Sequence, residues 1–265
     1  MATVGTGIAR ILVALDAETS NRTTVEAAVR FAEEFQAELV GLFVTETDML
    51  NLASLPLARH LIGHSMTAQT LEAGALERAM RILADQARAD LAAAAESRHV
   101  KWSFRSVSGS SEEAVVTETM GFDVVMFGRS RRHRAVAWAT RTRCGVLVAT
   151  PEVRTGRPIV LWMDDGDAAF DIALRLARQS RVKLLILVPD TGSPERVEDL
   201  AHTVATAGVR GEIRPVSSKT SATAFRELRL AHPGLLIVSR SSPIARHEDF
   251  EGFVDNLDCT IFLTA

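Results

Sequence analysis

The sequence predicts an α/β protein made of two tandem, doubly wound domains, each built around a five-stranded parallel sheet. Two observations support this prediction. The same order of elements occurs twice along the 265 residues, and apolar runs alternate with amphipathic helical patterns instead of hairpin turns. Strands joined by helices run parallel and are covered on both faces. We place the first domain at residues 1–151 and the second at 157–265.

Each predicted strand of the first domain has a counterpart in the second. The first strand of each domain is an apolar run ending in an acid, and the second, fourth and fifth strands are also apolar. The third strand alternates as an edge strand does, and Pro215 fits only at an edge because proline lacks a backbone donor. The pairs are 10–16 with 158–164, 38–44 with 183–188, 102–107 with 212–216, 123–128 with 234–239, and 144–149 with 259–264.

The first domain has a longer connection between its second and third strands, at about residues 45–99. This insertion contains a long helical pattern with an apolar stripe that includes Leu83 and Leu91. Such a stripe usually packs within the chain. We therefore expect most of the helix to be core, and we take residues 50–61 as the best candidate for an exposed interaction surface.

Composition excludes several classes of partner. The net charge of −3 gives no general attraction to a polyanion. Only 5% of the residues are aromatic and none is tyrosine, so few side chains are present on which nucleic-acid bases could stack. We therefore expect no nucleic acid as a partner. Apolar runs remain shorter than the ~20 residues that span a bilayer, and the first residues do not resemble a secretory leader. We expect a cytoplasmic protein without a membrane partner.

Other reactive side chains do not form a recognisable site. Cys144 and Cys259 occupy equivalent positions before the fifth strands, where we interpret them as buried hydrophobes, with a disulfide or redox role as the alternative. His60 and His64 have helical spacing, but Gly63 interrupts it and no acid completes the pattern, so we expect no metal. Because the sequence has no nucleophile elbow and no ordered cysteine–histidine arrangement, we predict no catalytic residues.

Several ordered motifs of the first domain resemble the universal stress protein family in its tandem form. They are ILVALD, the helical AVRFAEEF, AELVGLFV, DVVMFGRS and CGVLVAT. The resemblance covers nearly all of residues 8–150 and is weaker over 158–265, where order and spacing are kept. It implies an adenine-nucleotide-hydrolase-like fold, a role in stress response and frequent dimer formation. Some members of the family bind ATP and others do not.

In the ATP-binding members, an aspartate ends the first strand and an apolar residue at the end of the second lies near the adenine. The fourth strand then enters a Gly-x-x-Gly-x9-Gly-Ser/Thr loop that holds the phosphates through backbone N–H groups, which requires close approach and positive φ. The matching residues are Asp16, Val44 and Gly128. The chain departs from the pattern at Arg131, which replaces the second glycine, and at Arg141 and Thr142, which replace the Gly–Ser pair.

The candidate nucleotide cleft therefore consists of Asp16, Val44, Gly128, Arg129, Ser130 and Arg131. Our leading hypothesis is that the arginines abolish phosphate binding. The protein would then be a non-enzymatic stress-response protein with no bound cofactor, acting through a small ligand, a protein partner or a homodimer. In the alternative, Arg129 and Arg131 hold the phosphates of ATP or AMP with their side chains, and the protein is a nucleotide-binding regulator. A third hypothesis is an adenylating or nucleotide-hydrolysing enzyme.

Overall fold

The computed structural model describes residues 7–15, 17, 22–46, 59–62, 67–70, 73–150, 156–164, 167–189, 194–217 and 220–265. The strands of the first half are β1 (Arg10–Leu15), β2 (Glu38–Glu46), β5 (Trp102–Gly109), β6 (Val124–Phe127) and β7 (Gly145–Val148). Those of the second half are β8 (Ile159–Trp162), β9 (Leu184–Pro189), β10 (Gly211–Val216), β11 (Leu235–Ser239) and β12 (Thr260–Thr264). A separate antiparallel hairpin is formed by β3 (Arg59–Ile62) and β4 (Thr67–Thr70).

The helices lie between these strands, as the sequence predicts. The first half contains α1 (Arg22–Phe35), α3 (Ala73–Ser97), α4 (Ser111–Glu118), the short 3-10 helix η2 (Arg129–Arg134) and α5 (Ala135–Arg141). The second half contains α6 (Asp167–Ser180), α7 (Pro194–Thr206), α8 (Ser221–Leu230) and α9 (Phe250–Asp255). No helix in the described part of the chain is long and apolar enough to cross a membrane.

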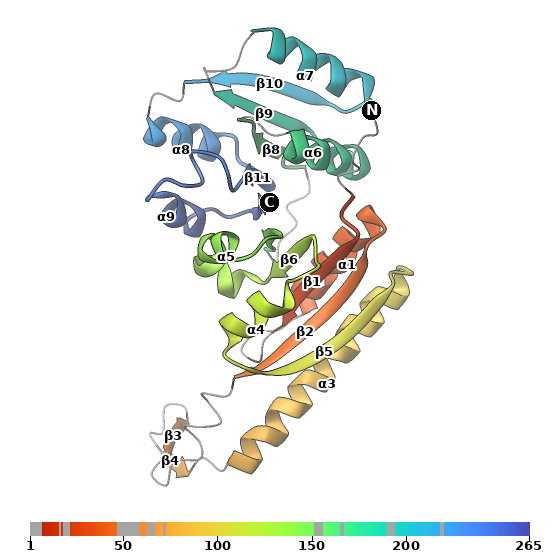
Figure 1. The fold of residues 1–265 in the computed structure, drawn as a ribbon, viewed down its shortest axis with the longest axis vertical. Coiled ribbons are helices and arrows are strands. Elements are labelled where there is room, and N and C mark those ends of the chain that lie inside the picture. The colour runs from red at the N-terminus through yellow and green to blue at the C-terminus, as the bar shows by residue number, and fades with distance from the viewer. Residues whose placement is uncertain are drawn as a thin grey trace.

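The ten main strands form one continuous sheet in the order β10-β9-β8-β11-β12-β7-β6-β1-β2-β5 (Figure 1). Within each half all neighbouring strands are parallel, which confirms the doubly wound prediction. Both predicted edge strands, β5 and β10, lie at the ends of the sheet, and Pro215 is in β10. The domain boundary proposed at residue 151 stays a prediction because that residue is outside the described ranges.

The two halves meet where β7 pairs antiparallel with β12, so the two predicted sheets are joined into one. Leu147 lies opposite Phe262 at the centre of this junction. The Phe262 ring crowds Gly145, where an added Cβ would lie only 2.7 Å from ring atom Cε2. The same ring meets Phe31 of α1 edge-on, at 5.7 Å between centroids. Glycine at position 145 therefore leaves room for the Phe262 ring to pack against the junction between the halves.

Helices cover both faces of the sheet in a consistent way. Along β1, Ile11, Val13 and Leu15 belong to the core cluster that includes residues of α1, α3, α6 and α7, whereas Leu12 and Ala14 belong to the cluster that includes residues of α4, α5, α8 and α9. This alternation is the expected consequence of strand geometry, in which successive side chains point to opposite faces. Each of the two core layers includes residues from both halves of the chain.

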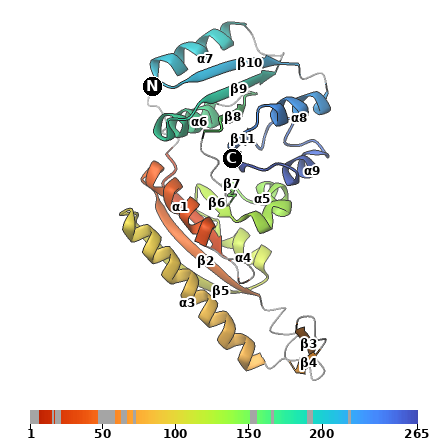
Figure 2. The ribbon, with the colours of Figure 1, turned by 180° about the vertical axis from the view of Figure 1, so that it is seen from behind.

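The long helix α3 only partly confirms the expected core stripe. Leu91 is buried, but Leu83 is 39% exposed and its neighbour Ile82 is 67% exposed. Figures 1 and 2 show α3 beside β5 and extending past the sheet towards the hairpin. The expected interaction surface at 50–61 lies mostly outside the described residues, and His60 is in a strand instead of a helix.

Candidate functional site

In an open α/β sheet, ligands bind at the carboxyl ends of strands where the strand order reverses. This point lies between β1 and β6 in the first half and between β8 and β11 in the second. Gly128, Arg129, Ser130 and Arg131 follow β6 and therefore lie at the first of these points. Val44 is buried in β2, on the other side of β1. Asp16 lies outside the described residues, so its position relative to the loop stays a prediction.

Gly128 serves close packing in this structure. Its φ of −74° is accessible to any residue, so positive φ does not explain the glycine at this position. A Cβ at position 128 would instead lie 2.7 Å from the hydroxyl oxygen of Thr24, a buried residue of α1. The expected reliance on positive φ is therefore wrong at Gly128, and contact with α1 is the physical reason for a glycine there.

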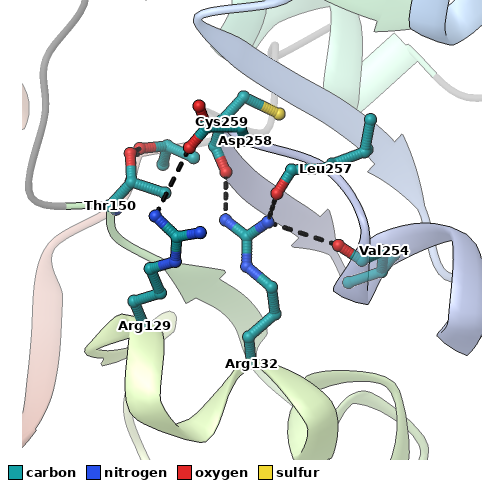
Figure 3. Close-up of polar contacts among 8 residues, drawn as sticks. Arg129, Arg132, Thr150, Val254, Leu257, Asp258 and Cys259 are labelled. Atoms are coloured by element: carbon teal, nitrogen blue, oxygen red, sulfur yellow. Dashed lines mark hydrogen bonds and ion pairs between the residues drawn. The ribbon is translucent and has the colours of Figure 1, made fainter.

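Two arginines of η2 reach across to the second half of the chain (Figure 3). Arg129 is exposed and forms an ion pair with Asp258, with 3.4 Å between Nη1 and Oδ1. Arg132 is only 5% exposed. Its Nη1 donates to the carbonyls of Val254, at 3.3 Å, and Leu257, and its Nη2 donates to the carbonyl of Cys259.

The contacts of Arg132 lie at and just beyond the end of a helix. Val254 is in the last turn of α9, where its carbonyl also accepts from the backbone N–H of Leu257, and Leu257 and Cys259 lie between α9 and β12. The guanidinium therefore adds donors to the segment that leads out of α9. Burial lowers the pKa of Arg132 from its usual value, and its Nε has no hydrogen-bond partner. A buried cation with three carbonyl acceptors ties the two halves together on the α5 and α9 face.

Arg240 makes the reciprocal contact from the second half. It follows β11 and donates from Nη1 to the carbonyls of Thr142, at 2.6 Å, and Ala139, at 3.4 Å. Both acceptors lie at the C-terminal end of α5. The two contacts are thus reciprocal. The arginine that follows β6 binds the end of α9, and the arginine that follows β11 binds the end of α5.

At the equivalent point of the second half, an acid is held by its own neighbours. The Asp164 carboxylate accepts a hydrogen bond from Trp162 Nε1 at 3.1 Å and another from the Ser242 hydroxyl. Ser242 is buried and accepts a bond from the backbone N–H of Ile244. These residues border a pocket of about 110 Å³, well below the 300–1,000 Å³ typical of ligand sites.

Both cysteines are free and buried, which fits the interpretation as small hydrophobes. Burial raises the pKa of the Cys259 thiol to about 12 and also raises the pKa of Cys144. Because a thiol must ionise to react, these shifts disfavour nucleophilic or redox chemistry at neutral pH. In the described ranges, His, Cys, Asp and Glu side chains form no cluster of three or more that could hold a metal ion.

In the sequence, a basic run is formed by Arg129, Arg131, Arg132 and Arg134. We interpret it either as a grip for a polyanion or an acidic partner or as a solvated charge run, and neither interpretation places Arg132 inside the protein. Its acceptors are more than 120 residues away in the chain, and a run of basic residues does not indicate which one points inward. The available signal was the repeat itself. Arg240 follows the fourth strand of the second half as Arg129 follows that of the first, so both loops were candidates for contacts between the halves.

These features define a tandem, doubly wound α/β protein whose halves share one sheet and exchange arginine contacts. Residues 7–138 match the model of the Universal stress protein family. Through this first half, the chain belongs to the universal stress protein family.

Solved structures support the fold over the whole length of the chain. A universal stress protein from Archaeoglobus fulgidus DSM 4304 is similar with a TM-score of 0.67 and 10% identity, over 98% of this chain and 97% of that one. A functionally unknown protein from Pseudomonas aeruginosa PAO1 is similar with a TM-score of 0.60 and 14% identity, over 98% and 93%. At these identities the similarity concerns the fold alone. The comparison with curated proteins gave no match.

Proposed function

We propose that the protein is a non-catalytic universal stress protein that acts by binding a small ligand or a protein partner, and that its loop after β6 has exchanged phosphate binding for contact between the halves. The observation that carries the proposal is the set of contacts of Arg132. Both terminal nitrogens of this guanidinium donate to carbonyls of residues 254–259. They are therefore committed to the protein and not to a phosphate group.

The neighbouring residues support the same proposal. Arg129 is paired with Asp258, whose carboxylate would repel a phosphate placed beside it. In the second half, the carboxylate of Asp164 is already bound by Trp162 and Ser242, next to a pocket that is small for a nucleotide. Self-association and a role in stress response belong to this proposal as expectations from the family.

Calorimetric titration of the whole chain with ATP·Mg²⁺ and with AMP tests the proposal. We expect no saturable binding at micromolar concentrations and no phosphate release from ATP. Micromolar binding that is lost in an Arg129→Ala/Arg131→Ala variant, but kept in Arg81→Ala on the exposed part of α3, would replace the proposal with a nucleotide-binding regulator. Phosphate release or formation of an adenylated product would replace it with an enzyme. Sedimentation analysis of the same samples checks the expected homodimer.

A further inference from the structure

A pocket of about 470 Å³ lies between α1 and α6, on the face of the sheet opposite α5 and α9. Its walls come from both halves of the chain and are mainly apolar, with Phe31, Met126, Leu147, Leu176 and Leu235 among them. A pocket of this volume, with apolar walls and a few polar groups, is typical of a site for a small organic molecule. It shares no described residue with the loop 128–134, so it is independent of any nucleotide binding there.

α1 and α6 lie next to each other (Figure 2), and Glu34 and Ser180 at their C-terminal ends both line the pocket. There the Ser180 hydroxyl donates to Glu34 Oε1 at 3.3 Å, and Arg175 Nη2 donates to the backbone carbonyl of Glu34 at 3.2 Å. Burial raises the pKa of the Glu34 carboxyl to about 7. At neutral pH this carboxyl is therefore close to half protonated and contributes only part of a negative charge.

Among the residues that the structure describes, the other charged groups at this pocket are cationic. Arg30 of α1 and Arg157, just before β8, line it, and Arg175 lies beside it over the ring of Phe35, with 4.8 Å between Cζ and the ring centroid. The carboxylate of Glu33 is paired with Arg98 at 2.6 Å. The described groups around the pocket thus carry a positive charge whenever Glu34 is protonated, which favours an anionic group in the ligand and disfavours an amine.

We propose that the pocket between α1 and α6 binds a small amphipathic anion, with an apolar body against Phe31, Leu147 and Leu176 and a carboxylate-type head group near Arg30 and Arg157. The apolar walls require a ligand with a hydrocarbon or aromatic body, which a free phosphate lacks. The two arginines distinguish the anion from a neutral molecule of the same shape, because only the anion forms charge-assisted hydrogen bonds with them.

Glu34 makes this binding sensitive to pH. The groups that act on its carboxyl are Arg30 and Glu33 from its own helix and Arg175 and Ser180 from α6. Protonation of Glu34 removes a negative charge that would repel the ligand. Affinity should therefore rise as pH falls through 7, by up to about tenfold between pH 8 and pH 6, and binding at neutral pH should take up protons.

Calorimetry of the whole chain with decanoate tests the proposal, with decan-1-ol and decyltrimethylammonium as probes that have the same chain and different head groups. Decanoate should bind with one site per chain, more tightly than either control. Glu34→Gln should bind decanoate with little dependence on pH, because the amide resembles the protonated acid. Ala27→Trp, which places an indole on the α1 wall of the pocket, should abolish binding, whereas Ala93→Trp on an exposed face of α3 should not.

Circular dichroism and thermal unfolding show whether each variant is folded. Loss of binding in a folded Ala27→Trp variant, or the flattened pH dependence of Glu34→Gln, supports the site. The proposal is overturned if decanoate does not bind, if the alcohol or the ammonium compound binds as tightly, or if binding depends on pH equally in the parent chain and in Glu34→Gln.

Discussion

The two halves of the sheet are built alike. Apart from the longer connection between β2 and β5 in the first half, they differ in the segment that follows their fourth strand. After β6, Gly128 leads into a cationic 3-10 helix with Arg132 buried in it. After β11, Ser242 lies in a turn-rich segment and donates to Asp164, the acid that follows β8. The strands keep the same order because their apolar runs are buried on both faces. The segment at their carboxyl ends can change with little effect on the sheet.

Despite this difference, the halves share one feature, which is an arginine after the fourth strand that binds carbonyls of the other half. Arg132 binds carbonyls at the end of α9, and Arg240 binds carbonyls at the end of α5. Both arginines therefore stabilise the junction on one face of the sheet. They are not equivalent in energy, because Arg132 is buried and binds three carbonyls, whereas Arg240 is half-buried and binds two. Substitutions can measure this asymmetry.

The largest expected effect is that of Arg132→Ala. The substitution removes the arginine donors from the carbonyls of Leu257 and Cys259, whereas the carbonyl of Val254 keeps the backbone N–H of Leu257. An unsatisfied buried group costs about 1–3 kcal/mol before the structure relaxes. We expect the free energy of unfolding to fall by about 3 kcal/mol, measured by urea denaturation of the whole chain. Arg129→Ala is the matched control on the same 3-10 helix. Its ion pair is exposed, so the loss should stay below about 1 kcal/mol. Equal losses of unfolding free energy in the two variants would contradict the larger contribution that we assign to the buried contacts of Arg132.

Arg240→Ala should have the next largest effect. It removes the 2.6 Å bond to the Thr142 carbonyl and the weaker one to Ala139. Since the side chain is half-buried, water can partly replace it, and we expect a loss of about 1–2 kcal/mol in the same unfolding assay. Arg246→Ala, at an exposed position in the same segment, serves as the control. A loss as large as that of Arg132→Ala would show that the two contacts are symmetric in energy as well as in position.

Ser242→Ala tests the arrangement that is specific to the second half. It removes the hydroxyl that donates to Asp164 and accepts from the Ile244 N–H, while Trp162 Nε1 still binds the acid. Because one donor to Asp164 remains, we expect a loss of about 1 kcal/mol in unfolding free energy. Ser241→Ala changes an exposed neighbouring serine and should lie within about 0.5 kcal/mol of the parent chain. A neutral Ser242→Ala variant would contradict the role given to this hydrogen bond.

The strands were predictable from sequence because each is a short apolar run between polar segments, and the alternation of the third pair indicated the edges. The junction was not predictable in the same way. Residues of β7 pair with residues of β12 that are more than 110 positions away, and a buried apolar strand has the same pattern whether one or two neighbours pair with it. The segment between the two predicted domains, residues 152–157, is polar and short in the sequence, and this predicted only that the halves pack closely.

The candidate site shows the same limit more sharply. The position of Gly128 in the repeat identified the loop at the switch point, and the basic run drew attention to its charge. The direction of each arginine depends on tertiary contacts, since Arg132 points into the junction while Arg129 stays exposed only three residues earlier in the chain. Glycine at position 128 is explained by Thr24 of α1, a contact that no local pattern reveals.

The smallest expected effect concerns Glu34, which lies on the opposite face of the junction from the arginines. Its pKa is raised from 4.5 to about 7, mainly by burial, so the folded chain binds more protons than the unfolded chain between these values. Stability should therefore decrease as pH rises from about 4.5 to 7 and then level off, and Glu34→Gln should remove this decrease. A fully buried carboxyl with such a shift would account for about 3 kcal/mol. Because Glu34 is partly exposed, we expect the variant to exceed the parent chain by about 1 kcal/mol at pH 8 and by nearly nothing at pH 4.5. Urea denaturation across this pH range measures the difference.

Glu33→Gln is the control, since that carboxylate is exposed and paired with Arg98. A Glu34→Gln variant whose stability follows the parent chain at every pH would show that the Glu34 carboxyl is solvated in the folded chain, unlike the buried Arg132 on the other face of the junction.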